Sequence, residues 1–151
     1  MKYKILLFDL DDTLLDFAAN EADSLSKLFK QHGYTLTDEV FQLYASINKQ
    51  LWADYENGVI ELREVLNSRF SKTMTKLGVS VGGTEWEDQY REHLGNGCQL
   101  MEGALEVCQS LSKSHRLYVV TNGVSVTKNI INSLFFINLI CIAFVLYLTM
   151  H

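Results

Sequence analysis

Three carboxylates follow a short apolar run near the N-terminus and raise the question of what holds so much negative charge together. The run Ile5–Phe8 is uninterrupted, and Asp9, Asp11 and Asp12 come directly after it. Because Asp9 and Asp11 are two residues apart, their side chains lean the same way in an extended backbone. Two neighbouring anions are unfavourable unless a cation or a proton separates them. A hard divalent cation such as Mg²⁺, which prefers oxygen ligands, is the predicted solution.

A second polar cluster follows a second apolar run much later in the chain. Leu117–Val120 leads into Thr121 and Asn122. In open parallel sheets ligands bind at the carboxyl ends of the strands, so the two clusters converge if the two strands are neighbours. A nucleophilic carboxylate, a second carboxylate for acid–base catalysis and a hydroxyl–amide pair for phosphoryl oxygens suit phosphoryl transfer. The simpler alternatives are a solvated turn, or a helix cap in which Asp12 and Thr13 cap a following helix.

The apolar pattern predicts two strands separated by a block of helices. Residues 3–8 are predicted to form a strand buried on both faces, because the run is short and does not alternate. Between residues 20 and 111 the apolar spacing is helical, and Thr84 with Glu87 forms a predicted capping box. Glycine-containing turns separate the predicted helices at Gly33, Asn57-Gly58 and Gly78. The strands are too far apart for a simple crossover, so we predict a parallel α/β core with a helical insertion of roughly 80 residues.

Composition narrows the class of protein. The net charge is −5 and no basic cluster is present, which argues against a nucleic-acid partner. Cys98, Cys108 and Cys141 are far apart and lack metal-ligand spacing, so we predict buried thiols in a reducing compartment. The N-terminal apolar run is too short for a signal peptide. A cytoplasmic location is therefore expected.

Both motifs resemble those of the haloacid dehalogenase-like (HAD) hydrolases. The segment ILLFDLDDTLLD is similar to the first motif of that superfamily, an apolar strand followed by DxDxT. The segment LYVVTNG is similar to the second motif, an apolar strand that ends in Thr or Ser. The TNG ending and the length of the helical block look most like the 5′-nucleotidase branch, which includes phosphatases of noncanonical nucleotides. The resemblance covers about residues 1–127.

The resemblance implies an α/β fold, with an incomplete Rossmann-like HAD core and an inserted helical cap. Residues 1–15 and 100–128 would form the core, and residues 16–99 would form the cap. Residues 129–151 would be an apolar tail that does not match the family. A cap of this kind closes over the active-site crevice, excludes water and selects the leaving group.

Carried over position by position, the resemblance implies a Mg²⁺-dependent phosphomonoester hydrolase. Asp9 would be the nucleophile that forms an aspartyl-phosphate, and Asp11 would be the general acid and base. Mg²⁺ would be bound by the Asp9 carboxylate and the Asp11 backbone carbonyl. Thr121 would bind the transferring phosphoryl group, with Asn122 beside it, while Asp12 stands where many relatives have glycine. The implied substrate is a small phosphate ester, a nucleoside 5′-monophosphate.

The later motifs of the superfamily have no counterpart in this sequence. A lysine and a third, acidic cluster are expected further along, but Lys128 follows Asn122 too closely and no Asp or Glu comes after Glu106. We therefore expect this chain alone to hydrolyse phosphate esters poorly or not at all. The alternative from another functional class is a non-catalytic remnant that binds metal or phosphate weakly.

The C-terminal segment, residues 129–150, contains no charged side chain. It could be the product of a frameshift or premature end, or a pair of strands or a helix that completes a reduced core. It could also be a tail anchor, since an uncharged run of about 20 residues can span a bilayer. We prefer the first explanation because the family pattern breaks off mid-core where the composition changes. Membrane contact is expected only through this tail, and the sequence carries no signal for oligomeric state.

Overall fold

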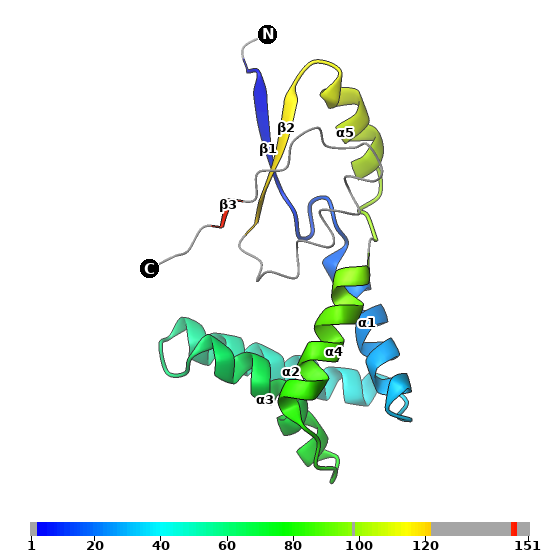
Figure 1. Ribbon diagram of the computed structural model, residues 1–151, viewed down its shortest axis with the longest axis vertical. Helices are drawn as coiled ribbons and strands as arrows, with labels where there is room; N and C mark the ends of the chain where they lie inside the picture. The colour runs from blue at the N-terminus through cyan, green and yellow to red at the C-terminus, as the bar shows by residue number, and fades with distance from the viewer. Residues whose placement is uncertain (1–2, 98, 122–145, 148–151) are drawn as a thin grey trace. The chain divides into compact units, whose positions relative to one another are not determined.

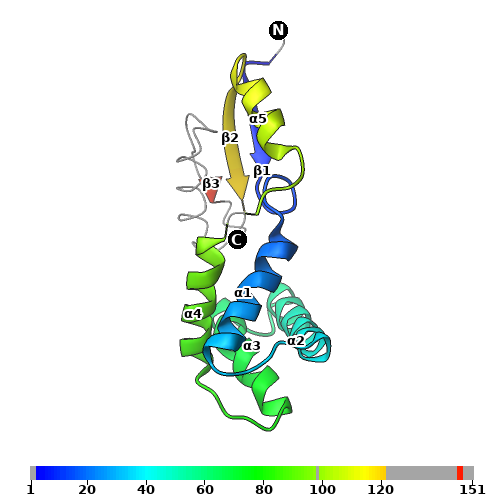
Figure 2. The same ribbon diagram turned by 90° about the vertical axis from the view of Figure 1, so that its right-hand side faces the viewer.

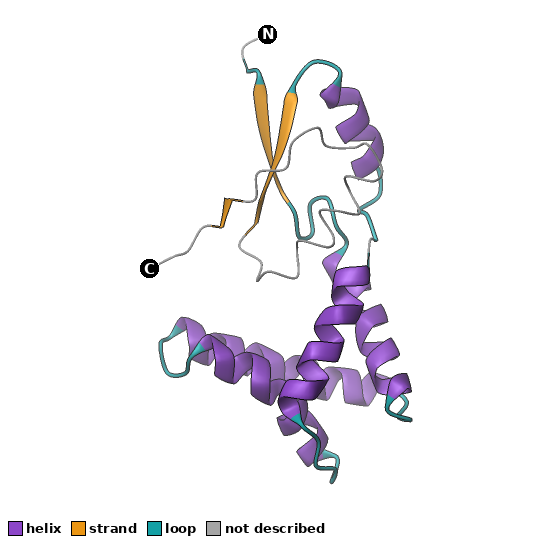
Figure 3. Ribbon diagram, in the orientation of Figure 1, coloured by secondary structure: helices purple, strands orange, loops and turns teal. Residues whose placement is uncertain are grey.

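The computed structural model describes residues 3–97, 99–121 and 146–147. Contacts divide the chain into two compact units, one of Met1–Ser24 with Leu94–His151 and one of Leu25–His93. The first unit contains the strands and the second contains most of the helical insertion (Figures 1 and 3). The domain limits expected from the resemblance stay a prediction.

The first unit is built on a parallel sheet. Its strands are β1 (Ile5–Asp9), β2 (Arg116–Thr121) and the short β3 (Leu146–Tyr147), in the order β1-β2-β3 (Figure 1). The predicted strands β1 and β2 are thus direct neighbours although a long helical insertion separates them in sequence. The α/β fold expected from the sequence is confirmed.

One face of this sheet packs against the helix α5 (Ala104–Ser112), which lies beside the strands in Figure 2. Leu117 and Val119 of β2 are buried in this core together with Cys108 of the helix. On the other face the side chains of β1 are exposed, since Ile5 is 51% exposed and Leu7 is 62% exposed. The prediction that the first strand is buried on both faces is therefore wrong for the described residues, because a helix covers only one side of β1.

The second unit is helical. Its elements are α1 (Phe17–Gln31), α2 (Asp38–Glu56), α3 (Leu62–Lys76) and α4 (Gly83–Asn96), of which α1 and α4 extend into the first unit. The predicted breaks are confirmed, since Gly33, Gly58 and Gly78 follow three of these helices with φ values of 78°, 70° and 80°. Glycine adopts this left-handed conformation without steric cost, so each helix ends where the sequence places its glycine.

Aromatic rings and one ion pair fill the core of the helical unit. Phe70 lies 5.3 Å from the ring of Tyr44 and 5.3 Å from the ring of Tyr90. Among these rings the buried Arg69 donates two hydrogen bonds to Glu87, both at 2.7 Å. The predicted capping box is therefore wrong, because Arg69 holds the Glu87 carboxylate inside the unit.

The N-terminus of α4 is also two residues earlier than a capping role for Thr84 requires. The helix begins at Gly83, and the backbone N–H of Trp86 donates to the carbonyl oxygen of Gly82 at 3.1 Å. Gly82 thus occupies the cap position and Thr84 lies inside the first turn, exposed to solvent. The observed start of α4 thus differs from the one that the local sequence signal predicted.

Within residues 3–97 and 99–121, no helix has the length and hydropathy needed to cross a bilayer. The three explanations of the C-terminal tail fall outside the described residues, apart from the two residues of β3.

Candidate active site

The candidate site starts at the carboxyl end of β1. Asp9 is the last residue of that strand and pairs in register with Val120 of β2. Thr121 is the next residue of β2 and ends it. Because the strands are parallel, Asp9 and Thr121 lie at the same edge of the sheet, where ligands bind in folds of this class.

A tight turn follows β1 and presents its acidic residues to one side. The carbonyl oxygen of Leu10 accepts from the N–H groups of Leu14 and Leu15, both at 2.9 Å. Leu10, Leu14 and Leu15 are buried in the core beneath the turn. Asp9 and Asp12 are exposed, because apolar anchors alternate with the polar residues of the turn. Local sequence thus determines which side chains face solvent.

Asp12 adopts a backbone conformation that few non-glycine residues accept. Its φ is +57°, and its N–H donates to the carbonyl oxygen of Leu15 at 2.8 Å. Asp and Asn enter this left-handed region more readily than other side chains. The glycine expected at this position from the resemblance would meet the same requirement without strain.

A second segment of the chain holds the end of the turn. The N–H of Asp16 donates to the carbonyl oxygen of Gln99, and the N–H of Met101 donates to that of Leu14, both at 3.0 Å. Leu15 and Leu100 form an antiparallel bridge between these two hydrogen bonds. The entry to the helical insertion and the exit from it are therefore joined next to the acidic turn.

Asp16 caps the helix that leaves the turn. Its Oδ1 accepts from the N–H of Ala19 at 2.9 Å, in the first turn of α1. The alternative in which Asp12 and Thr13 cap the following helix is wrong, since the chain makes a complete turn before α1 begins. The signal was available in the sequence, because Asp16 stands directly before an apolar helical stripe.

The electrostatics of the turn centre on Asp11. Burial raises the pKa of the Asp11 carboxyl, and the charges of Asp9 and Asp12 raise it further. A like charge nearby always disfavours ionisation, so Asp11 retains its proton more readily than an isolated aspartic acid. Thr13 Oγ1 also lies 3.5 Å from Asp9 Oδ2, within reach of a long hydrogen bond.

The donor set of the turn suits a hard cation. The turn carries the carboxylates of Asp9, Asp11 and Asp12. The sequence has no cationic side chain between Lys4 and Lys27. Oxygen ligands of this kind are what Mg²⁺ prefers, and such a site usually keeps several water ligands. No cluster of three or more His, Cys, Asp or Glu arranged as a metal site occurs in the described residues. Within those residues a bound Mg²⁺ would therefore rely on few protein ligands.

The predicted site residues divide into two groups. The structure brings Asp9 and Asp11 together at the end of β1 and places Thr121 at the end of the neighbouring strand. Asn122 lies outside the described residues. The contacts of Gln99 and Met101 with the turn were not predicted, since no local pattern marks a pairing across such a long insertion.

Comparison with known proteins agrees with this geometry, although no family model matches the chain. YfnB of Bacillus subtilis, a protein named as a HAD-hydrolase, is 42% identical over 127 residues, which are 84% of this chain and 54% of YfnB. A crystal structure of YfnB superposes with a TM-score of 0.86 at 37% identity and covers 96% of this chain and 64% of that one. The matched part of this chain belongs to the HAD hydrolases.

Two further facts come from these HAD relatives. The pyrimidine 5′-nucleotidase PynA of Streptococcus pneumoniae is 37% identical over 126 residues, which are 83% of this chain and 53% of PynA. The YfnB crystal was bound to magnesium and showed interdomain movement. The chain spans about half the length of the curated relatives that it matches.

Proposed function

We propose that this chain carries the nucleophile half of a Mg²⁺-dependent phosphomonoesterase site, with nucleoside 5′-monophosphates as the substrate class. The observation that carries the proposal is the position of Asp9 and Asp11 at the end of β1, in register with the end of β2. The nucleotide as substrate is supported by the similarity to PynA, which is named as a pyrimidine 5′-nucleotidase.

In the first step a carboxylate oxygen of Asp9 attacks the phosphorus atom of the monoester. The bond between phosphorus and the ester oxygen breaks, and the leaving oxygen takes a proton from the Asp11 carboxyl. The raised pKa of Asp11 suits this role, because its carboxyl is protonated more often than an ordinary aspartic acid at the same pH. The product of the step is an aspartyl-phosphate on Asp9.

In the second step a water molecule attacks the phosphorus atom of the aspartyl-phosphate. Asp11, now a carboxylate, accepts a proton from that water, and the bond between phosphorus and the Asp9 oxygen breaks. Inorganic phosphate leaves and both aspartates return to their initial states. Mg²⁺, bound by the Asp9 carboxylate and the Asp11 backbone carbonyl, would supply positive charge that lets the carboxylate approach the phosphate.

We also expect this chain by itself to hydrolyse phosphate esters at a low rate. Thr121 would hold the phosphoryl group with Asn122, but no carboxylate follows Glu106 that could add a further metal ligand. Loss of one electrostatic contributor lowers kcat by about 10²–10³ in enzymes that depend on such groups. The competing possibility is a chain that binds Mg²⁺ and phosphate and has no turnover.

The test is phosphate release from UMP by the purified chain, measured with MgCl₂ and with EDTA. We expect slow, Mg²⁺-dependent release that Asp9→Asn abolishes and Asp11→Asn strongly reduces. Asp88→Asn is the matched control, since it removes the same charge from an exposed position on α4, outside the acidic turn. It should keep most of the activity. Release that persists in Asp9→Asn would refute the assignment, whereas Mg²⁺ binding without any release would favour the non-catalytic alternative.

A further inference from the structure

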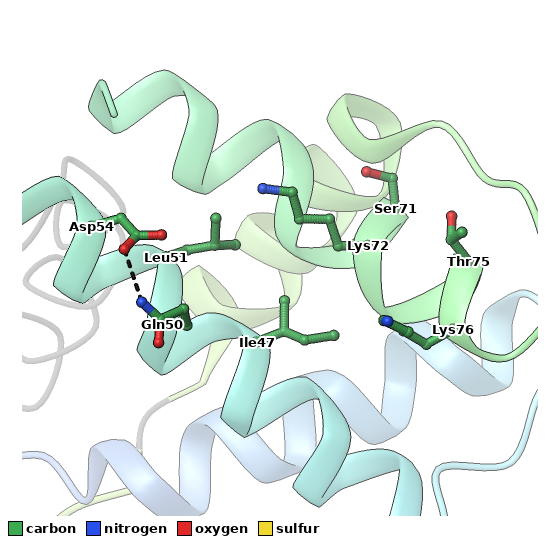
Figure 4. A pocket seen from close by; sticks show the side chains of 8 residues that line it. All are labelled: Ile47, Gln50, Leu51, Asp54, Ser71, Lys72, Thr75 and Lys76. Atoms are coloured by element: carbon green, nitrogen blue, oxygen red, sulfur yellow. Dashed lines mark hydrogen bonds between the residues drawn. The ribbon is translucent and has the colours of Figure 1, made fainter. Parts of the chain in front are cut away.

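A groove runs between α2 and α3 in the helical unit, and nothing in the proposed phosphatase chemistry uses it (Figure 4). Its volume is about 390 Å³, which lies within the range of small-molecule sites. The lining residues all come from these two helices and are Ile47, Gln50, Leu51, Asp54, Ser71, Lys72, Thr75 and Lys76. Among the described residues, a ligand of this groove is therefore held by α2 and α3 of the helical unit.

The α2 side of the groove is an apolar floor with a polar end. Ile47, Leu51 and Asp54 lie on one face of the helix because they are spaced by one turn each. Leu51 is almost fully buried, with 3% of its surface exposed, so it forms a fixed apolar floor. At the polar end, Gln50 Nε2 donates to Asp54 Oδ1 at 2.8 Å, which orients the carboxylate (Figure 4).

The α3 side of the groove carries the positive charge. Ser71 and Lys72 are repeated one helical turn later by Thr75 and Lys76, so two hydroxyls and two ammonium groups line the same wall. Lys72 Nζ lies 3.9 Å from Glu64 Oε1, but both side chains are about half exposed. An exposed pair at this distance contributes little, so an anionic ligand can compete for Lys72.

Lys76 is the more available of the two cations. It is exposed at the end of α3, and in the part of the chain that the structure describes it takes part in no ion pair. Two ammonium groups beside an apolar floor match a ligand that has an anionic group at one end and an apolar body. An inorganic anion alone would leave the floor in contact with water.

We propose that the groove between α2 and α3 binds a small organic anion. The anionic group lies between Lys72 and Lys76, where the hydroxyl of Thr75 adds a hydrogen bond, while that of Ser71 donates to the carbonyl oxygen of Ser68 at 3.0 Å. The apolar body lies over the floor at Leu51 and buries the part of Ile47 that is otherwise in contact with water. A phosphonate, a carboxylate or a sulfonate shares this chemistry. The site belongs to the helical unit and does not depend on the function proposed for the acidic turn.

The experiment uses the full 151-residue chain without Mg²⁺, titrated with phenylphosphonate, benzoate and inorganic phosphate and followed by methyl and amide NMR shifts. We expect phenylphosphonate to shift the signals of Ile47 and Leu51 and to bind about tenfold more tightly than inorganic phosphate, because it also buries a ring. Benzoate, with a single negative charge, distinguishes a carboxylate site from a phosphonate site. Shifts confined to residues 9–16 would overturn the proposal.

Charge variants separate specific binding from general attraction. Lys72→Gln with Lys76→Gln should weaken phenylphosphonate binding about tenfold or more, because both charge-assisted contacts are lost. The control, Lys30→Gln with Lys49→Gln, removes the same charge from exposed helix positions outside the groove and should change the dissociation constant less than about twofold. Equal weakening in both double variants, or none in the first, would overturn the proposal. Ile47→Ser should affect phenylphosphonate but not inorganic phosphate.

Discussion

The molecule holds charge in two contrasting ways. In the helical unit the buried carboxylate of Glu87 receives two hydrogen bonds from Arg69, and Asn48 Oδ1 lies 3.4 Å from the same guanidinium. In the acidic turn Asp9, Asp11 and Asp12 lie together without a cation from the described residues. Charge that is fully compensated contributes to folding, whereas like charge left together costs stability and is available for a ligand.

The pKa values of Arg69 and Asp11 are shifted in keeping with this difference. Burial alone would lower the pKa of Arg69, but Tyr44 and the paired Glu87 outweigh it and raise the pKa above the ordinary value. The pairing with Glu87 thus favours the charged form of Arg69. At the turn, burial and the neighbouring carboxylates raise the pKa of Asp11 above the ordinary value.

The largest expected effect comes from breaking the compensated cluster. Glu87→Gln leaves the Arg69 charge buried without its partner, and the free energy of unfolding should fall by about 3–5 kcal/mol. Urea unfolding followed by far-UV circular dichroism measures this. Glu61→Gln is the control, because Glu61 and Arg63 form a pair with side chains 77% and 82% exposed, and it should cause no measurable change. Equal losses in both variants would remove the distinction between the clusters.

The next effect concerns the uncompensated cluster and Mg²⁺. If the acidic turn binds Mg²⁺ only when folded, a Mg²⁺ concentration 100-fold above the dissociation constant should stabilise the chain by about 2.7 kcal/mol. Hydrogen exchange of the β1 and β2 amides reports this locally. Asp9→Asn should lose most of the stabilisation, while the exposed Asp88→Asn on α4 should retain it. Stabilisation of both variants alike would exclude the turn as the metal site.

A smaller effect is expected from relieving the like charge. Because the folded-state pKa of Asp11 is raised, its contribution to stability is present below the ordinary pKa of 3.8 and is lost as pH rises through the folded-state pKa. Asp11→Asn removes that loss, so the variant should be more stable than the wild type near neutral pH without Mg²⁺. The difference should shrink as the pH falls toward 3.8. Unfolding curves across this pH range measure it, and a constant difference would contradict the assigned cause.

The smallest effect tests a helix start. A Thr84 that capped α4 would cost about 1 kcal/mol when replaced by alanine. Since Gly82 occupies the cap position, Thr84→Ala should leave the free energy of unfolding unchanged. Thr37→Ala is the matched comparison, because Thr37 Oγ1 accepts from the N–H of Val40 at the start of α2. A larger loss for Thr84→Ala than for Thr37→Ala would reverse this assignment.

Much of the fold could be predicted because the relevant signals are local. The helix ends coincide with glycines that adopt a positive φ, and the apolar run before Asp9 marks a strand. The convergence of the two polar clusters depended on the two strands being neighbours, and the structure meets that condition by pairing β1 with β2. The prediction that β1 is buried on both faces was wrong. A short apolar run without alternation does not show which elements cover the strand.

The candidate site shows the same division. The sequence by itself determined the crowding of Asp9, Asp11 and Asp12, because spacing is a property of the local chain. Only the tertiary structure decided that Gln99 and Met101 hold the turn and that Arg69 takes Glu87 away from a capping role. Those contacts join residues distant in sequence, and their free energy comes from burial and geometry that no local pattern encodes.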